Sequence, residues 1–244
     1  EEADRVVSEL GYDAIKFDLD VPSGHEKDRA NRHLRNPEID HKVEIVKAAT
    51  EAVGDRADVA FDCHWSFTGG SAKRLAEAIE PYDVWWLEDP VPPENHEVQE
   101  NVTKSTTTPV AVGENVYRKF GQRTLIQPQA VDIIAPDLPR VGGMRETRKI
   151  ADMADMYYIP VAMHNVSSPI GTMASAQVAT AIPNSLALEY HSYELGWWED
   201  LVEEDNLIEN GRMEIPEEPG LGLTLDLDAV GEHMVEGETL FDEA

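Results

Sequence analysis

The sequence predicts an α/β fold, a (β/α) barrel in which parallel strands alternate with helices. Three observations predict it. Short apolar runs without strict alternation recur between residues 12 and 188, as expected of parallel strands that are covered on both faces. Amphipathic segments separate these runs. Ionisable residues follow the runs about 25 residues apart, which is close to the length of one strand–helix unit.

Each apolar run is an expected strand, and the runs are 12–17, 59–65, 84–87, 109–112, 131–135, 159–163 and 186–188. The expected helices are 1–10, 40–53, 70–80, 94–105, 119–126, 143–156 and 169–181. Gly11, Gly54 and Pro81 stand where helices should end. Because strand and helix alternate, we expect a parallel sheet with right-handed crossovers.

A closed barrel is favoured over an open dinucleotide-binding sheet. An open sheet of that kind needs a Gly-rich turn with GxGxxG spacing directly after an early strand, and Gly69-Gly70 and Gly142-Gly143 lack that spacing. The regular unit length and the polar strand ends both favour the barrel. A chain of 244 residues is long enough to form one such domain.

Two segments stand apart from this pattern. Residues 19–39 form the longest connection and concentrate basic side chains in an acidic protein, namely His25, Arg29, Arg32, His33 and Arg35. A loop of this length is often a lid or a binding loop, and the alternative is a salt-bridged surface insertion or a subunit contact. From residue 210 the chain is rich in Pro and Gly and then acidic, so we expect 1–209 to form the barrel and 210–244 to leave it.

The formal net charge of −28 excludes several classes of partner. So acidic a surface repels nucleic acid and anionic membranes, and it repels an acidic substrate unless a metal or local cations reverse the field. Self-repulsion on this scale is screened at high ionic strength, so we expect an acid-rich protein from a very salty cytoplasm. The alternative is an ordinary acidic enzyme.

The single cysteine, Cys63, excludes an intrachain disulfide and a cysteine-rich zinc site. No apolar run reaches the ~18 residues of a membrane span, and the N-terminus shows no secretory signal. We therefore expect a cytoplasmic protein.

Ionisable side chains stand at the end of each expected strand. They are Lys16, Asp18, Asp62, His64, Glu88, Asp89, Glu114, Asp137, His164 and Glu189. In a parallel barrel the carboxyl ends of the strands meet at one rim, where active sites lie. Any one of these residues could simply cap the next helix, but their common spacing indicates an active-site mouth.

Asp62, Glu88 and Glu114 place carboxylates on three adjacent strands. Such groups raise one another's pKa unless a cation compensates them, and a hard divalent ion suits oxygen ligands, Mg²⁺ first and Mn²⁺ second. His64 and His164 would flank that ion from opposite sides. Asp137, one strand earlier, could orient the His164 imidazole and stabilise its charge. The alternative is that the histidines are structural.

Several short motifs occur in a fixed order over nearly the whole chain: AIKFD, FDCHW, WLEDP, VGEN, PDLPRVGG, MHN, LEYH and PGLGLTLDL. This order resembles the enolase superfamily, specifically its mandelate racemase-like branch. The resemblance implies that Asp62, Glu88 and Glu114 bind Mg²⁺ and that Asp137 and His164 form a base dyad. It also implies that Glu189 hydrogen-bonds the substrate carboxylate or enolate.

The resemblance further implies an enolase-type barrel that is preceded by an α+β capping domain and a first barrel strand. Both lie ahead of the point where this sequence starts, so we expect seven strand–helix units without the first strand. Residues 210–244 then correspond to the segment that returns to the capping domain.

Two local features narrow the expected chemistry. Racemases of the family carry Lys-x-Lys at the second strand, whereas this chain has Lys16-Phe17-Asp18 and lacks the second lysine base. The Asp62-Cys63-His64 motif resembles the acid-sugar dehydratases, such as galactonate dehydratase, in which the matching histidine is a general acid.

The expected function is therefore Mg²⁺-dependent dehydration of a sugar acid to a 2-keto-3-deoxy acid through an enediolate. His164 removes the α-proton, His64 protonates the leaving hydroxyl, and Lys16 and Glu189 neutralise charge on the substrate oxygens. The alternatives are a racemase or epimerase of a 2-hydroxy acid and a non-catalytic acidic scaffold. We expect a small-molecule sugar-acid substrate, no nucleic-acid or membrane partner, and a homo-oligomer.

Overall fold

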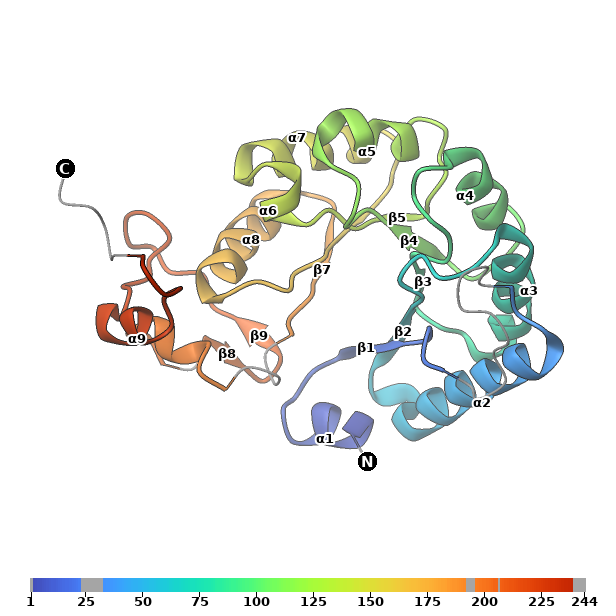
Figure 1. Cartoon of the computed structure of the whole chain (residues 1–244), viewed down its shortest axis with the longest axis horizontal. Helices are drawn as coiled ribbons and strands as arrows, with labels where there is room; N and C mark the ends of the chain where they lie inside the picture. Colours follow the sequence, from blue (N-terminus) through green and yellow to red (C-terminus); the bar gives the residue numbers. More distant parts are fainter. Residues whose placement is uncertain (1, 23–32, 192–195, 206, 239–244) are drawn as a thin grey trace.

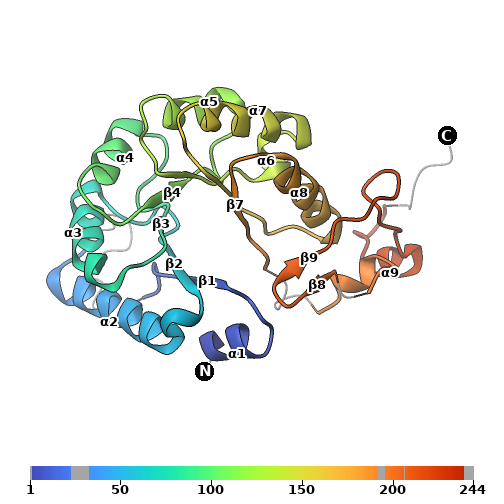
Figure 2. The same ribbon diagram turned by 180° about the vertical axis from the view of Figure 1, so that it is seen from behind.

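The computed structural model describes residues 2–22, 33–191, 196–205 and 207–238 (Figure 1). Seven parallel strands form one sheet in chain order, each paired with the next. The strands are β1 (Ala14–Asp18), β2 (Asp58–Asp62), β3 (Leu87–Glu88), β4 (Val110–Val112), β5 (Ile133–Ile134), β6 (Val161–Met163) and β7 (Ser185–Leu188). The sheet curls into a half-barrel with helices on its outer side (Figures 1 and 2), which confirms the predicted fold class.

Seven of the described helices that accompany the strands lie where the sequence predicts them, and one, Leu138–Val141, is not predicted. They are α1 (Glu2–Ser8), α2 (Asn36–Val53), α3 (Gly69–Ile79), α4 (His96–Thr103), α5 (Arg118–Ile126), α6 (Leu138–Val141), α7 (Met144–Asp155) and α8 (Pro169–Ala181). Helix α2 ends at Gly54, whose φ of +58° lies in the left-handed region that favours glycine. Among the described residues, none of the helices has the length and apolar character needed to span a membrane.

The parallel register sets the carboxyl ends of neighbouring strands side by side. Asp18 at the end of β1 pairs with Asp62 at the end of β2, and Asp62 pairs with Glu88 at the end of β3. Because side chains alternate between the faces of a strand, Ala60 shares a face with Asp62, and Trp86 shares a face with Glu88. Ala60 and Trp86 belong to one small buried apolar cluster. The acidic strand ends therefore lie directly beyond an apolar layer.

The C-terminal segment is more structured than the sequence predicts. Although its composition is rich in Pro and Gly, it contains an antiparallel hairpin of β8 (Ile208–Glu209) and β9 (Arg212–Met213), followed by helix α9 (Leu227–Glu232). Nη2 of Arg212 lies 2.7 Å from Oδ2 of Asp13, so the hairpin packs beside the loop that precedes β1 (Figure 2). Segments from both edges of the open sheet therefore meet.

Candidate active site

Asp62, Glu88 and Glu114 form what we term the carboxylate cluster, at the carboxyl ends of β2, β3 and β4. One oxygen of each lies within 4.8 Å of the others, and all three residues are buried. Burial raises the pKa of Glu88 to about 7 and also raises the pKa of Asp62. For Glu114, burial acts in the same direction but is outweighed by the His164 hydrogen bond and by nearby cations, so its pKa is lowered.

The amine of Lys16 lies among these carboxylates. Its Nζ is 2.9 Å from Oε1 of Glu88, 3.1 Å from Oε1 of Glu189 and 3.5 Å from Oδ2 of Asp62. Burial acts to lower the pKa of Lys16, but the three carboxylates outweigh burial and hold that pKa well above its usual value. Lys16 is thus a fixed positive charge at the mouth of the half-barrel.

The carboxylate cluster fits a hard divalent cation. Its donors are all carboxylate oxygens, the ligand type that Mg²⁺ and Mn²⁺ prefer. Two of the carboxylates are oriented by neighbouring donors: the backbone N–H of His64 donates to Oδ1 of Asp62 (2.8 Å), and Nε1 of Trp86 donates to Oε2 of Glu88 (2.8 Å). Such supporting hydrogen bonds are typical of residues that hold a metal.

His164 follows β6 and is 6% exposed. Its Nδ1 lies 2.8 Å from Oδ2 of Asp137, and its Nε2 lies 2.8 Å from Oε2 of Glu114. Burial acts to lower the pKa of His164, but these two hydrogen bonds outweigh it and raise the pKa to about 10. The other oxygen of Asp137 accepts from the backbone N–H of Arg140 (2.9 Å) and caps α6. Asp137 therefore performs both roles weighed from the sequence, as a helix cap and as the partner of His164.

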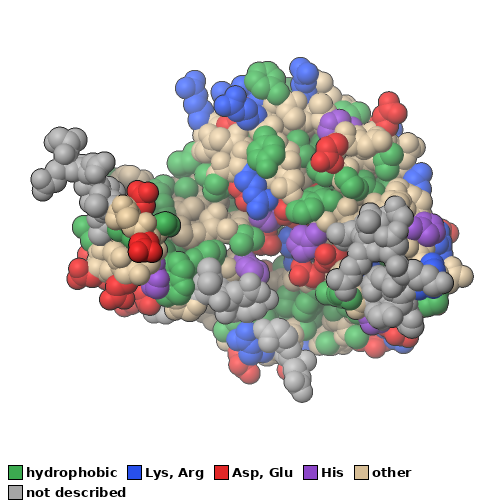
Figure 3. Space-filling view, viewed as in Figure 1, with side chains coloured by type: hydrophobic (Ala, Val, Ile, Leu, Met, Phe, Trp, Pro, Cys, Tyr) green, Lys and Arg blue, Asp and Glu red, His purple; other side chains and the backbone are tan. Residues whose placement is uncertain are grey.

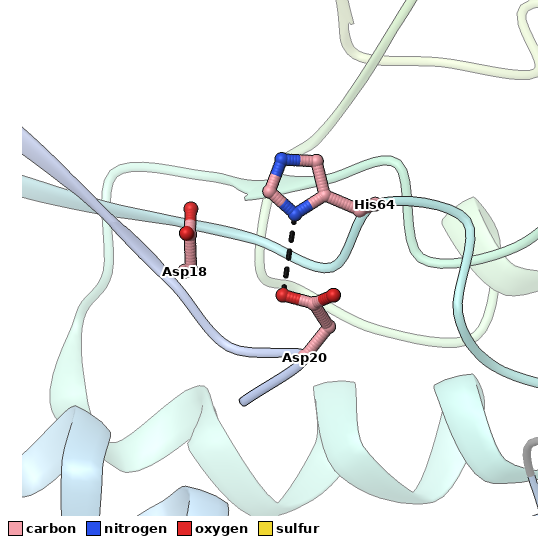
Figure 4. Close-up of side chains that lie close together, drawn as sticks. All are labelled: Asp18, Asp20 and His64. Atoms are coloured by element: carbon pink, nitrogen blue, oxygen red, sulfur yellow. Dashed lines mark hydrogen bonds and ion pairs between the residues drawn. The ribbon is translucent and has the colours of Figure 1, made fainter. Parts of the chain in front are cut away.

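His64 follows β2 on the other side of the carboxylate cluster. Its Nε2 lies 3.6 Å from Oδ2 of Asp62, and its Nδ1 lies 3.2 Å from Oδ1 of Asp20. Burial acts to lower the pKa of His64, but the nearby carboxylates of Asp62, Asp20 and Asp18 outweigh burial and raise it. Figure 4 shows the hydrogen bond between His64 and Asp20. No pattern in the sequence pointed to Asp20 as the partner of His64.

Glu189 follows β7 and contacts both Lys16, on β1, and the segment that follows β6. One of its oxygens contacts Lys16, and the other accepts from the backbone N–H of Asn165 (3.1 Å) and lies 3.8 Å from Nε2 of His164. The structure therefore brings together all the site residues that the sequence predicts: Lys16, Asp62, His64, Glu88, Glu114, Asp137, His164 and Glu189. Figure 3, which is drawn in the orientation of Figure 1, shows histidine and acidic side chains near the centre of the molecule.

Arg140 is a member of this network that the sequence analysis missed. Its Nη1 lies 3.2 Å from Oε1 of Glu114, and its Nε lies 3.6 Å from Oδ2 of Asp137. The guanidinium thus connects the carboxylate cluster to the partner of His164. It stands on α6, a helix of four residues that is too short to produce a periodic pattern.

The basic segment 19–39 is described only in part. At the start of α2 the backbone N–H and the Nε of Arg35 donate to Oε2 of Glu38 (2.7 and 3.1 Å), and Nδ1 of His33 lies 3.4 Å from Oγ of Ser71. These contacts anchor the C-terminal end of the segment to helices. His25, Arg29 and Arg32 lie outside the described residues, so a lid or binding role for them stays a prediction.

Comparison with known proteins identifies a family and two similar relatives. Residues 1–229 match the family described as enolase C-terminal domain-like. The chain is 90% identical over 243 residues to a D-xylonate dehydratase of Haloferax volcanii, covering 100% of this chain and 59% of that protein. It is 31% identical to the D-galactonate dehydratase family member ManD of Chromohalobacter salexigens, covering 95% of this chain and 62% of that protein.

Among solved structures, the chain is similar to a mandelate racemase/muconate lactonizing enzyme-like protein from Rubrobacter xylanophilus. The two share 43% of their residues with a TM-score of 0.93, over 99% of this chain and 62% of that one. The chain therefore spans about three-fifths of the length of these relatives.

Proposed function

Since the chain belongs to the enolase C-terminal domain-like family, we propose that it dehydrates a sugar acid to a 2-keto-3-deoxy acid. The observation that carries this proposal is the placement of two histidines at opposite members of the carboxylate cluster. His64 lies beside Asp62, His164 lies beside Glu114, and each histidine has its own aspartate partner. An elimination needs one base and one acid at two neighbouring carbons, and two separated histidines meet that need.

The substrate we propose is D-xylonate or a closely related aldonate. The relative that is 90% identical carries the name D-xylonate dehydratase. Other relatives are named for gluconate, galactonate and mannonate, which differ from one another in hydroxyl configuration and from xylonate in length. Which of these aldonates is the substrate must therefore be decided by assaying a panel of them.

Asp62, Glu88 and Glu114 would hold Mg²⁺, with Mn²⁺ as the second choice. When bound there, a divalent cation supplies Lewis-acid stabilisation for negative charge on the substrate's carboxylate end. Lys16 contributes a second positive charge at the same place, because its amine is fixed by Glu88, Glu189 and Asp62. These positive charges offset the repulsion that a chain of net charge −28 exerts on an acidic substrate.

His164 would act as the base. Because Asp137 accepts the proton of Nδ1, the nitrogen that can take the α-proton is Nε2, which faces Glu114 and Glu189. Glu114 favours a proton on Nε2, and a divalent cation held by the carboxylate cluster would neutralise that carboxylate and free Nε2 to act as a base. The carbon–hydrogen bond at C2 breaks, the proton moves to Nε2 of His164, and the electron pair forms the double bond between C1 and C2 of an enediolate. That pair then forms the double bond between C2 and C3 as the hydroxyl at C3 leaves. Asp137 stabilises the imidazolium that results, since its carboxylate lies 2.8 Å from Nδ1.

His64 would act as the acid. As the bond between C3 and its hydroxyl oxygen breaks, Nε2 of protonated His64 donates a proton and the hydroxyl leaves as water. The resulting enol then tautomerises to the 2-keto-3-deoxy acid. Glu189, which contacts Lys16, would hydrogen-bond the substrate's carboxylate or enolate oxygens. Epimerisation is less well supported, because Asp18 stands where a second lysine base would be required.

We also infer the setting in which the site works. We propose that residues 1–209 are the catalytic domain and that 210–244 are the segment that returns to a capping domain. We propose a cytoplasmic homo-oligomer that acts on a small molecule, a state that size-exclusion chromatography with light scattering would check.

A panel of aldonates tests the proposed function. The purified protein is incubated with Mg²⁺ in high salt and with xylonate, gluconate, galactonate or mannonate, and 2-keto-3-deoxy acids are detected by derivatisation and mass spectrometry. We expect D-xylonate to be converted with loss of one water. Formation of a C2 epimer without any keto acid would contradict the proposal, as would the absence of product from every aldonate.

A further inference from the structure

Asp20 lies across from His64 because of the register between β1 and β2. Asp18 pairs with Asp62, so the residues two places further along each chain, Asp20 and His64, emerge opposite one another. Oδ1 of Asp20 lies 3.2 Å from Nδ1 of His64. Figure 4 shows the carboxylate of Asp20 directed at this nitrogen, while the other ring nitrogen points away. Of the three side chains drawn, Asp18 has no bond to the ring.

The backbone that carries Asp20 is held by a buried cation. Lys42, on α2, is 2% exposed, and its Nζ donates to the carbonyl of Leu19 (2.8 Å) and to that of Val21 (3.3 Å). A buried ammonium is costly unless its protons are hydrogen-bonded, so these contacts are firmly maintained. In addition, the N–H of Leu19 donates to the carbonyl of Asp62 (2.6 Å). The chain is thus fixed on both sides of Asp20.

The backbone that carries His64 is held equally closely. His64 and Trp65 have φ values of +43° and +56°, a conformation that side-chain-bearing residues adopt only when their surroundings impose it. The N–H of His64 donates to Asp62, and Nε1 of Trp65 donates to Oδ2 of buried Asp89 (2.9 Å). The Trp65 ring stands edge-on to the imidazole, with ring centroids 5.8 Å apart. Both partners of the contact are therefore placed by the fold.

We propose that Asp20 is a positioning residue for His64, an inference that rests on the dehydration proposed above. By accepting the proton of Nδ1, Asp20 leaves Nε2 as the ring nitrogen that delivers a proton to the leaving hydroxyl, and it turns Nε2 toward Asp62. The arrangement repeats the relation of Asp137 to His164 on the opposite side of the carboxylate cluster. One side-chain oxygen or nitrogen atom of each of Asp18, Asp20 and His64 lies within 4.8 Å of the others, and the hydrogen bond joins two of the three residues, Asp20 and His64.

Three variants of the whole protein test whether Asp20 acts on His64 through its hydrogen bond or only through its negative charge. Asp20→Ala removes the acceptor, and Asp20→Asn keeps an amide oxygen that can accept the Nδ1 proton. The matched control, Asp18→Ala, removes a neighbouring carboxylate that is not bonded to the ring. We expect Asp20→Ala to lower kcat for dehydration at least about tenfold, with KM changed less than about threefold. Asp20→Asn should recover part of that loss, and Asp18→Ala, which removes a nearby charge but no hydrogen bond to the ring, should lower kcat less than Asp20→Ala does.

A second readout is independent of activity. Long-range ¹H–¹⁵N NMR spectra of histidine-labelled protein report which ring nitrogen of neutral His64 carries the proton, with the signal assigned by its loss in His64→Asn. We expect the Nδ1–H tautomer in wild type and in Asp18→Ala, and a shift toward Nε2–H in Asp20→Ala. If Asp20→Ala does not fold, the wild-type and Asp20→Asn spectra still decide the tautomer.

The outcomes distinguish this inference from the proposed function. If wild type forms no keto acid from any aldonate, the proposed function fails, whatever the tautomer is. If wild type dehydrates its substrate but Asp20→Ala loses no more activity than Asp18→Ala, Asp20 does not position His64. A wild-type His64 that carries its neutral-state proton on Nε2 would overturn the inference as well.

Discussion

Nε2 of His164 lies 2.8 Å from Oε2 of Glu114, so the histidine that pairs with Asp137 is also bonded to the carboxylate cluster. Both side chains are almost fully buried, at 6% and 5% exposure. Arg140, whose side chain is 38% exposed, contacts both Glu114 and Asp137. Since buried polar groups polarise one another strongly, the proposed metal site and the proposed base act as one network.

Glu88→Gln should abolish dehydration and weaken Mg²⁺ binding. The substitution keeps the size of the side chain but removes a negative charge and one strong oxygen donor from the carboxylate cluster. The loss of affinity, measured by calorimetry, should exceed the roughly 10–100-fold typical of residues that only support a ligand. Glu77→Gln, at an exposed position of α3, is the matched control and should bind Mg²⁺ as wild type does. Full activity of Glu88→Gln, or of wild type in EDTA, would rule out the metal assignment.

Stability should rise with salt. The net charge of −28 makes the folded chain repel itself, and raising KCl from ~0.1 M to ~1 M shortens the Debye length from about 10 Å to about 3 Å. We therefore expect the melting temperature, followed by circular dichroism, to increase steadily over that range. A flat or falling melting temperature would show that self-repulsion does not govern stability.

Gly113→Ala should destabilise the fold and disturb the site. A Cβ at this position would lie 2.8 Å from backbone atoms of Ala135, and Gly113 directly precedes Glu114. Overpacking of this kind costs about 1–3 kcal/mol, so the urea midpoint should fall and Mg²⁺ affinity should fall with it. Gly70→Ala, where a Cβ meets nothing within 4 Å, is the matched control: it should leave Mg²⁺ affinity unchanged and should not lower the urea midpoint, because alanine is favoured over glycine in helix α3.

Cys63 should be unreactive in the folded protein. The residue is fully buried between Asp62 and His64, and burial, together with the neighbouring Asp62 carboxylate, raises the pKa of its thiol well above the usual value. Iodoacetamide should therefore fail to label native protein and should label it quantitatively in urea, as measured by intact mass. Rapid labelling without denaturant would mean that the end of β2 opens readily.

The strands and the carboxylate cluster could be predicted from sequence because they repeat. Buried parallel strands read as apolar runs, and the regular length of each strand–helix unit places the residues after each run at one rim. Asp62, Glu88 and Glu114 follow this rule, and so does His164. The structure places the seven expected strands within a few residues of the predicted positions.

The features that the sequence analysis missed depend on register or on very short elements. Asp20 becomes a partner of His64 only once β1 and β2 are known to pair Asp18 with Asp62. Helix α6, which carries Arg140, is shorter than two turns. The β8–β9 hairpin did have a local signal: Asn210-Gly211, where both φ values are positive, is a frequent two-residue hairpin turn. The Pro/Gly-rich composition of the segment masked it.

The most direct test of the central claim, that two histidines divide the work of an elimination, compares His64→Asn with His164→Asn. Each variant is incubated with Mg²⁺ and D-xylonate in D₂O, and deuterium at C2 of the recovered aldonate and keto-acid formation are measured by NMR and mass spectrometry. His41→Asn, on α2, is the matched control. We expect His164→Asn to lose both exchange and dehydration, and His64→Asn to lose dehydration by about 10²–10⁴-fold while keeping exchange. Full dehydration by His64→Asn, or exchange that persists in His164→Asn, would contradict the account.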